Sequence, residues 1–452
     1  MRTAALIGLI AFATYWSTLR IPVSGDATSH VYLAYSFVFD GDADLAEHAD
    51  APQPYVMNHL MYGDRVYSPY VPGNAALFAP LALVAGGLGV PAESPLAAGV
   101  LAKLLASALT ALAMAVVYLT LRTVARERIA IAVVFSCAFG TYAFSVASQV
   151  FMQHSATVAL VAIGLFLVRR GPAALAGLPL GVAIAVRPMN GLFALALLLY
   201  LARTPREALR AALWMLPGLA FLAVYDTVLF GSPLRLPGAT VELGSPLEGI
   251  AGNLLSPSRG LLVYSPQLAA GAAALLAAWR WRASDEVRLL RTGSLAAAGA
   301  LVLFGTYVDW YGGWTYGNRY LADALPLFAL AIAVGAEAGW ARSRPLVAAF
   351  WVATAWAVAI HAVGAGLYYF YWRGEHWDAV PDIGTTPWRL WDWTDTQWQW
   401  VLRRAVTEPD AALVVELAAL GAAAAAFALL ARRSGAGYGR PYRRSVPPSG
   451  RS

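Results

Sequence analysis

Charge and cysteine are what this sequence has least of. Only 13% of its 452 residues are charged and 59% are hydrophobic, whereas soluble domains contain about 25% charged residues. The single cysteine, Cys137, excludes a disulfide framework and a cysteine metal cluster. So much apolar surface cannot be buried inside one soluble core. The composition therefore predicts a polytopic membrane protein and excludes a soluble globular enzyme.

Lysine is almost absent as well, because Lys103 is the only lysine among the 32 basic residues. The arginines are scattered between apolar runs, so the net charge of +6 does not indicate a nucleic-acid partner. The sequence also lacks a phosphate-binding glycine loop and the H-E-x-x-H, CxxC and G-x-S-x-G patterns. Nucleotide hydrolysis, zinc proteolysis and serine hydrolysis on known motifs are therefore not expected.

Twelve apolar segments approach the length of about 20 residues that a membrane span requires. They predict an all-α, polytopic integral membrane protein with about 12 transmembrane helices. The two short segments that flank Arg187 and Pro188 are predicted to form a hairpin. The predicted spans are 3–19, 97–121, 129–147, 155–168, 173–187, 189–202, 210–230, 261–279, 293–309, 320–339, 345–366 and 411–431.

Arginine placement predicts the orientation of these spans, since basic loops stay in the cytoplasm. Arginines follow every second span, and further arginines lie in the tail after residue 431. Both termini are therefore predicted to be cytoplasmic, in a multi-pass protein of the plasma membrane. Residues 1–431 are predicted to form one transmembrane domain, and 432–452 a disordered basic tail. The arginines that follow the spans are Arg122, Arg126, Arg128, Arg169, Arg170, Arg203, Arg206, Arg210, Arg280, Arg282, Arg288, Arg291, Arg342 and Arg344.

Three long connections are then predicted on the outer side, at 20–96, 231–260 and 367–410. The first carries eight acidic residues against two arginines. If its apolar stretch 75–90 crossed the membrane, every later arginine cluster would lie on the outer side. This stretch is therefore predicted to be an interfacial helix. The third connection is rich in tryptophan, which favours the membrane interface.

Asp26 is the candidate catalytic residue, because it follows the first predicted span within a few residues of the membrane surface. A carboxylate there suits a general base that accepts a proton from a hydroxyl acceptor while a lipid substrate is held in the bilayer. The alternative is a helix cap, since Asp is a favoured capping residue and an apolar-periodic stretch follows. Spacing alone favours the cap.

Two basic residues near the outer ends of spans are candidate phosphate ligands, because charge at membrane depth is costly. Lys103 lies about one turn inside the second span, where it can hold a phosphate or snorkel to the surface. Arg187 lies at the turn of the short hairpin, where its guanidinium can bind phosphate through two nitrogens. Asp226, inside the seventh span, is expected to pair with a buried arginine.

Later segments place further candidates at the outer interface. Arg259 lies in SPSRGLLVYSP, and Arg319 in DWYGGWTYGNRYLADALP, where Trp314 offers a flat face for a sugar ring. The alternative for Arg319 is a salt bridge with Asp309 or Asp323.

Two residues elsewhere complete the candidate site. Tyr67, in the VYSPYVPGNAALFAPL segment, can stack on a sugar or simply be an interfacial aromatic, as can Tyr70. His154, in VFMQHSA, can contact a substrate or be a hydrogen-bonded interface histidine.

The layout resembles the GT-C superfamily of membrane glycosyltransferases, including protein O-mannosyltransferase-like and aminoarabinose-transferase-like enzymes. The resemblance covers most of the chain up to about residue 340. It rests on SGDATSHVYLAYSFVFDGDADL, VYSPYVPGNAALFAPL, the RP of GVAIAVRPMNG, SRGLLVYSP and WYGGWTYGNRYLADALP.

The resemblance implies an inverting transfer of a sugar, a hexose or pentose, from a polyprenyl-phosphate donor to a glycan, lipid or protein acceptor on the outer face. It assigns the base to Asp26 and the donor phosphate to basic residues such as Lys103 and Arg187. Ala27 stands where relatives commonly carry a second acid, so a divalent metal is not supported and no cofactor is predicted.

Two other functions stay open at this point. Twelve spans with embedded charges also fit a multi-pass transporter or flippase of a lipid or small solute, although the related halves typical of transporters are missing from the sequence. A transferase fold that has lost catalysis and serves as an assembly partner is the third possibility.

Overall fold

The structure, a computed structural model of the whole chain, describes residues 1–22, 24–49, 57–90, 94–233, 242–313, 315–367, 383 and 386–434. The described part is almost entirely helical. Its helices are α1 Arg2–Trp16, α2 Gly25–Tyr35, α3 Gly73–Gly87, α4 Pro95–Leu121, α5 Glu127–Phe139, α6 Gln153–Arg170, α7 Gly177–Val186, α8 Gly191–Leu201, α9 Pro205–Phe230, α10 Pro246–Leu255, α11 Leu261–Tyr264, α12 Ala269–Ala277, α13 Asp285–Gly305, α14 Leu325–Ala338, α15 Arg344–Leu367, α16 Gln397–Thr407 and α17 Ala411–Arg433.

Five of the described helices, α4, α9, α13, α15 and α17, are long and apolar enough to cross a membrane. Shorter helices lie at the other predicted spans, so the count of 12 stays a prediction. At the predicted hairpin, α7 ends at Val186 and α8 begins at Gly191. This break follows from Pro188, because the residue before a proline is disfavoured in a helix.

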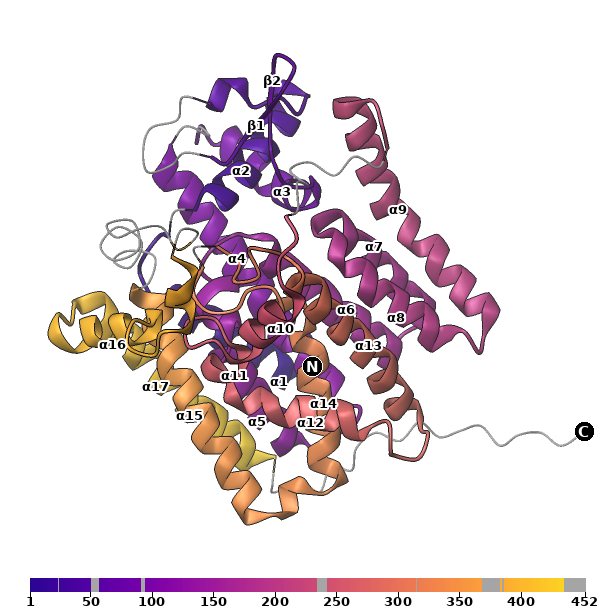
Figure 1. Cartoon of the computed structure of the whole chain (residues 1–452), viewed down its shortest axis with the longest axis vertical. Helices are drawn as coiled ribbons and strands as arrows, with labels where there is room; N and C mark the ends of the chain where they lie inside the picture. Colours follow the sequence, from indigo (N-terminus) through magenta and orange to yellow (C-terminus); the bar gives the residue numbers. More distant parts are fainter. Residues whose placement is uncertain are drawn as a thin grey trace, which may run out of the picture.

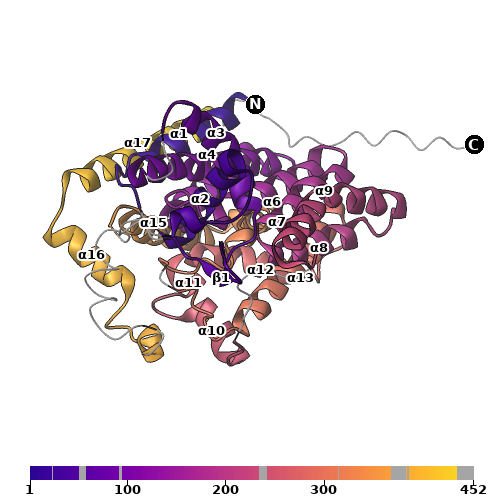
Figure 2. The same cartoon turned by 90° about the horizontal axis from the view of Figure 1, so that it is seen from above.

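The core lies around α14, which is apolar on all sides. Every residue from Leu325 to Ala333 is buried, as expected for a helix surrounded by other helices. By contrast, α9 leaves Leu209, Leu213 and Val228 more than half exposed. That surface matches a helix that faces lipid. Figure 2 shows α9 and α16 at opposite sides of the bundle.

The connection between α1 and α4, predicted to be outer, folds over one end of the bundle, where α2, α3 and a two-stranded hairpin lie together (Figure 1). The predicted interfacial stretch forms α3, with Pro80 inside it. The hairpin pairs β1 (Leu60–Tyr62) with β2 (Arg65–Tyr67) and was not predicted. It forms because Gly63, with φ of 62°, makes a two-residue turn possible.

The C-terminal region agrees with the predicted last span, since α17 runs to Arg433. Most of the predicted basic tail lies outside the described residues, and the division into domain and tail stays a prediction.

Asp226 is 1% exposed on α9, and its carboxylate makes no hydrogen bond within the described part of the chain. No arginine of the described residues pairs with it.

Candidate functional site

Asp26 lies in the first turn of α2, and it is not the helix cap. Ser24 occupies the capping position with extended backbone, and Asp26 is the second residue of the helix. The carboxylate of Asp26 instead accepts hydrogen bonds from other side chains. The capping alternative is therefore wrong, although an acid in the first turn is still stabilised by the helix dipole.

Three residues from distant parts of the chain hold the Asp26 carboxylate. Its Oδ1 accepts from the Tyr70 hydroxyl at 2.5 Å and from Asn58 Nδ2 at 2.7 Å. Its Oδ2 accepts from Arg319 Nη1 at 3.0 Å, and both members of this ion pair remain 20% exposed. The carboxylate is thus oriented by neutral donors on one oxygen and by a cation on the other.

These contacts decide the protonation state of Asp26. Burial raises the pKa of Asp26, but the Arg319 guanidinium and the Tyr70 hydrogen bond lower it by more, so the pKa lies below its ordinary value. Burial and the neighbouring carboxylate raise the pKa of Tyr70. Asp26 is therefore ionised at neutral pH, while Tyr70 stays protonated and donates a hydrogen bond to the Asp26 carboxylate.

A glycine-rich loop brings Arg319 to this carboxylate. Gly312, Gly313 and Gly317 all have φ between 64° and 76°, a backbone region that glycine enters without strain. A Cβ on Gly312 would lie 3.2 Å from Cγ of Arg319, so the loop packs closely against that side chain. The predicted alternative for Arg319, a bridge with Asp309 or Asp323, is wrong because Arg319 pairs with Asp26.

Arg187 faces the same space from the break before Pro188. Its backbone is extended, and its Nη1 donates to Asp323 at 2.8 Å and meets His154 Nδ1 at 3.3 Å. The Phe304 ring lies 4.7 Å from its Cζ. Asp323, which is fully buried, also accepts from Thr157 and Asn190. The position of Arg187 is therefore fixed through Nη1 and the aromatic ring.

These residues share one cavity of about 230 Å³. It joins four of the residues predicted from the sequence, Asp26, Arg187, Arg319 and His154, although they come from four separate segments. The cavity is lined by Asp26, His30, Tyr70, Met152, Gln153, His154, Arg187, Phe304, Arg319 and Tyr320.

The lining residues that were not selected from the sequence are His30, Tyr70, Met152, Gln153, Phe304 and Tyr320. His30 lies one helical turn after Asp26, a spacing that places both on one face of α2 and could have identified it. Burial lowers the pKa of His30 to about 4, so its imidazole is neutral at pH 7. Tyr70 was considered together with Tyr67, and nothing in the sequence separates them.

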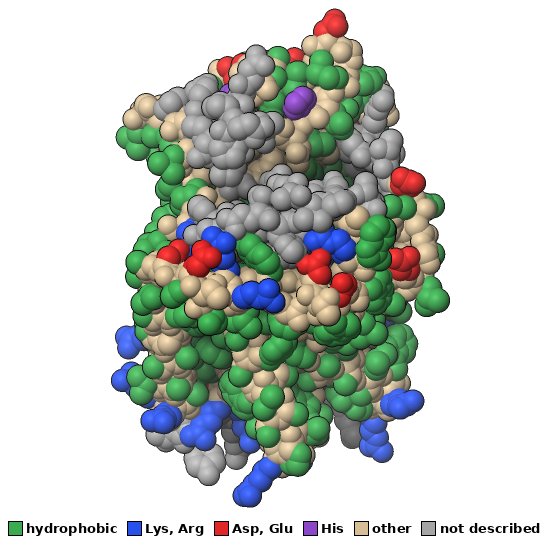
Figure 3. Space-filling view, turned by 60° about the vertical axis from the view of Figure 1, so that its left-hand side comes forward, with side chains coloured by type: hydrophobic (Ala, Val, Ile, Leu, Met, Phe, Trp, Pro, Cys, Tyr) green, Lys and Arg blue, Asp and Glu red, His purple; other side chains and the backbone are tan. Residues whose placement is uncertain are grey.

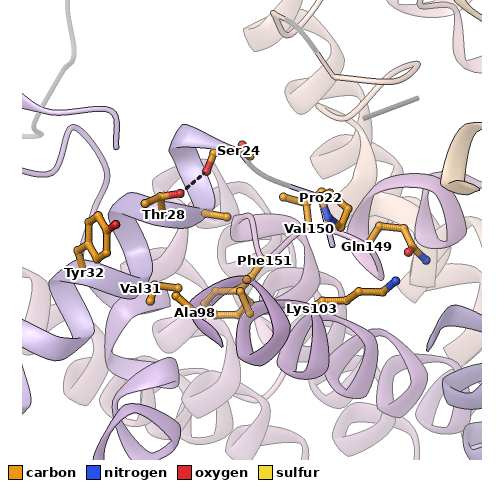
Figure 4. A pocket seen from close by; sticks show the side chains of 13 residues that line it. Pro22, Ser24, Thr28, Val31, Tyr32, Ala98, Lys103, Gln149, Val150 and Phe151 are labelled. Carbon is orange, nitrogen blue, oxygen red and sulfur yellow. Dashed lines mark hydrogen bonds between the residues drawn. The ribbon is translucent and has the colours of Figure 1, made fainter. Parts of the chain in front are cut away.

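Lys103 does not line this cavity. Figure 4 shows it in a separate pocket with Gln149 and with Thr28 and Val31 of α2. The volume of this pocket is about 20 Å³. Its Nζ donates to Thr18 Oγ1 and, at 2.6 Å, to the carbonyl of Arg20. Lys103 is 2% exposed, and its ammonium is engaged in bonds within the protein.

Two further predicted residues, Tyr67 and Arg259, also lie outside the cavity. Tyr67 packs its ring against Phe230 at a centroid distance of 5.0 Å. Arg259 is fully buried and donates to Gln397 and to the carbonyl of Gly313. Trp314 falls outside the described residues. Within the described part of the chain, no group of three or more His, Cys, Asp or Glu side chains is arranged to hold a metal ion.

The comparisons with known proteins identify the fold. No protein-family model and no curated protein matches this sequence. The crystal structure of ArnT from Cupriavidus metallidurans bound to undecaprenyl phosphate is similar, with a TM-score of 0.54, 12% identity, and 95% of this chain and 77% of that chain covered. The chain has the GT-C fold.

A second solved structure of this group, the Archaeoglobus fulgidus oligosaccharyltransferase in complex with Zn and sulfate, has a TM-score of 0.48 and 13% identity over 81% of this chain and 53% of that chain. The GT-C resemblance predicted from the sequence is confirmed at the level of the fold. At 12% identity the likeness to ArnT establishes this fold and not the reaction.

Proposed function

We propose that this GT-C protein is an inverting glycosyltransferase that moves a sugar from a polyprenyl-phosphate donor to an acceptor hydroxyl on the outer face of the membrane. One observation carries the proposal: an ionised carboxylate, Asp26, shares a cavity with the guanidinium groups of Arg187 and Arg319. The similar ArnT structure contains undecaprenyl phosphate, which supports a carrier of the same kind here.

The guanidinium groups have donors available for a phosphate. All hydrogen bonds that Arg187 makes within the described residues use Nη1. In the same part of the chain, Arg319 uses only Nη1 as well, toward Asp26 and the Met152 sulfur. Nε of Arg319 is buried, but its Nη2 and the remaining nitrogens of Arg187 can donate to phosphate oxygens, and such charge-assisted bonds are strong. Two fixed cations would stabilise the negative charge that grows on the leaving phosphate.

The reaction follows from this placement. The acceptor oxygen attacks C1 of the sugar while the bond from C1 to the phosphate oxygen breaks, so the transition state resembles an oxocarbenium ion. The phosphate leaves with the bonding electron pair and is held by Arg187 and Arg319. Asp26 takes the hydroxyl proton from the opposite face of the ring, which inverts C1. Because Asp26 has a lowered pKa, this proton moves only as the hydroxyl becomes acidic during attack.

The distribution of charge supports an outward-facing cavity. Figure 3 shows an apolar belt around the middle of the molecule, with most Lys and Arg side chains at its lower end, a few along its upper edge, and most acidic side chains in its upper half. The helices α2 and α3, which carry or adjoin the cavity, lie at the upper end (Figure 1). Basic ends face the cytoplasm, so we propose cytoplasmic termini and an extracytoplasmic site.

The test replaces the proposed base and measures binding and transfer separately. In Asp26→Asn, transfer from a polyprenyl-phosphate sugar should fall by about 10²- to 10⁴-fold, the usual contribution of a general base. Binding of undecaprenyl phosphate should persist, because Arg187 is untouched. The matched control is Asp40→Asn, since Asp40 is exposed in the same outer loop and does not line the cavity.

Full transfer by a correctly inserted Asp26→Asn variant would remove Asp26 as the base. If the wild-type protein binds no undecaprenyl phosphate and instead moves a lipid or solute across proteoliposomes, the transporter alternative replaces the enzyme.

A further inference from the structure

The loop that carries Arg319 is tied to a segment far along the chain. Gln397, the first residue of α16, is fully buried against this loop. Its Nε2 donates to the carbonyl of Thr315 at 3.1 Å, and its Oε1 accepts from the amide of Gly317 at 3.2 Å. One glutamine therefore binds two backbone groups that lie two and four residues before Arg319.

Arg259 completes the attachment from a second direction. Its Nη2 donates to the carbonyl of Gly313 at 2.8 Å, and its Nη1 donates to Oε1 of Gln397 and to the carbonyl of Ser258. The Tyr264 hydroxyl reaches the same Oε1 at 3.3 Å. Arg259 and Gln397 thus act as one hydrogen-bonded unit, which is buried beside the loop and does not line the cavity.

The segment around Gln397 is itself anchored next to Arg259. Ser256 Oγ donates to the carbonyl of Leu390 at 2.5 Å, and Trp398 Nε1 donates to the carbonyl of Pro257 at 3.1 Å. A capping box formed by Thr396 and Gln399 fixes the start of α16, where Gln397 lies. Gln397 therefore reaches the loop from a position that is held on both sides.

The loop needs such outside bonds because three glycines leave its backbone free to adopt many conformations. The ion pair between Arg319 and Asp26 tolerates little displacement of the loop, since Arg319 Nη1 and Asp26 Oδ2 are 3.0 Å apart. A displacement of about 1 Å would take these atoms beyond hydrogen-bond distance, and small misplacements of this size reduce catalysis strongly.

We infer that Gln397 and Arg259 are positioning residues, which hold the 312–319 loop so that Arg319 meets both Asp26 and the donor phosphate. This assigns a role to part of the tryptophan-rich outer connection 367–410. The effect on transfer rests on the proposed function. The effect on loop order does not, so the two can be tested apart.

The first experiment measures loop order by amide hydrogen exchange in the purified, full-length protein. In Gln397→Leu, exchange at 312–319 should accelerate by about tenfold, while exchange in α14 stays unchanged. Gln397→Glu, which keeps the acceptor oxygen but loses the donor to Thr315, should give a smaller acceleration. If Gln397→Leu does not fold, the exchange measured in Gln397→Glu tests the inference in its place. The matched control is Arg403→Leu, an exposed position on the same helix that is not part of the capping box. Unchanged exchange at 312–319 in both Gln397 variants would overturn the inference.

The second experiment is a double-mutant cycle on undecaprenyl phosphate binding. Gln397→Leu should weaken binding by about tenfold in the wild-type background and should have no further effect when combined with Arg319→Ala, because the residues act in series. Additive losses would overturn positioning through Arg319. If exchange accelerates at 312–319 but the wild-type protein binds no undecaprenyl phosphate, the proposed function fails while the attachment of the loop stands.

Discussion

Two charged clusters lie on opposite faces of α2, and only one of them is open to a ligand. Asp26 and His30 face the cavity of about 230 Å³ that holds Arg187 and Arg319. Thr28 and Val31, on the other face, line the pocket of about 20 Å³ beside Lys103. A volume of 20 Å³ accommodates about one water molecule.

The second cluster is closed because its cation is already bound by the protein. Lys103 donates to Thr18 and to the Arg20 carbonyl, and Arg20 pairs with Asp410 at the start of α17. Arg187 and Arg319 instead keep nitrogens that make no hydrogen bond within the described residues. The comparison teaches that an embedded cation is a candidate phosphate ligand only when it has both space and unused donors.

After loss of the proposed base, the largest expected effect is at a phosphate ligand of the open cluster. Arg187→Lys keeps a positive charge beside Asp323 but loses the planar guanidinium and its paired N–H donors. Transfer should fall by about 100-fold, as it does when one fixed transition-state donor is lost. Undecaprenyl phosphate binding should weaken by about tenfold. Both quantities can be measured on the purified protein, with Arg210→Lys as the exposed control. Wild-type binding and transfer in Arg187→Lys would show that Arg187 is only a structural partner of Asp323.

The sequence predicted the open cluster in part. Arg187 was identified because charge at membrane depth is costly and therefore informative, whereas Asp26, Arg319 and His154 were identified because they lie near the outer ends of predicted spans. Their contacts could not be predicted, because the residues lie far apart in the chain and meet only after the helices pack. The alternative considered for Arg319 was a bridge with Asp309 or Asp323, its neighbours in sequence, but it pairs with Asp26 across 293 residues.

The same reasoning could not separate Lys103 from Arg187, since both are single cations near the outer end of an apolar run. The difference lies in Thr18 and the Arg20 carbonyl, which belong to another segment and occupy the ammonium of Lys103. The fold class was easier to predict, because composition and the spacing of apolar runs depend on local sequence. The short hairpin β1–β2 was missed because a single glycine turn gives a weak signal.

The second expected effect concerns the closed cluster and falls on stability. Lys103→Met removes the donor to Thr18 and Arg20, and leaves Glu416, whose carboxylate interacts electrostatically with Lys103, without that charge. The free energy of unfolding should fall by about 1–3 kcal/mol, the usual cost of leaving buried polar groups unpaired. Thermal unfolding in detergent measures this loss.

In the same variant, undecaprenyl phosphate affinity should stay within about twofold of wild type. A Lys103→Met protein with normal stability and a large loss of donor affinity would reverse the comparison and restore Lys103 as a phosphate ligand.

The smallest expected effect is a shift in pH dependence within the open cluster. The Tyr70 hydroxyl helps to lower the pKa of Asp26, so Tyr70→Phe should raise that pKa toward its ordinary value. If Asp26 must be ionised to act, the acidic limb of kcat/KM should move to higher pH by about one unit, the equivalent of one hydrogen bond to a charged group. The sign is fixed because a carboxylate with a lowered pKa loses its charge only as pH falls through that value. Tyr67→Phe is the matched control, since Tyr67 lies in the same segment and outside the cavity, and its pH profile should overlay that of the wild type. An acidic limb that stays in place in Tyr70→Phe would mean that a group other than Asp26 titrates in the reaction.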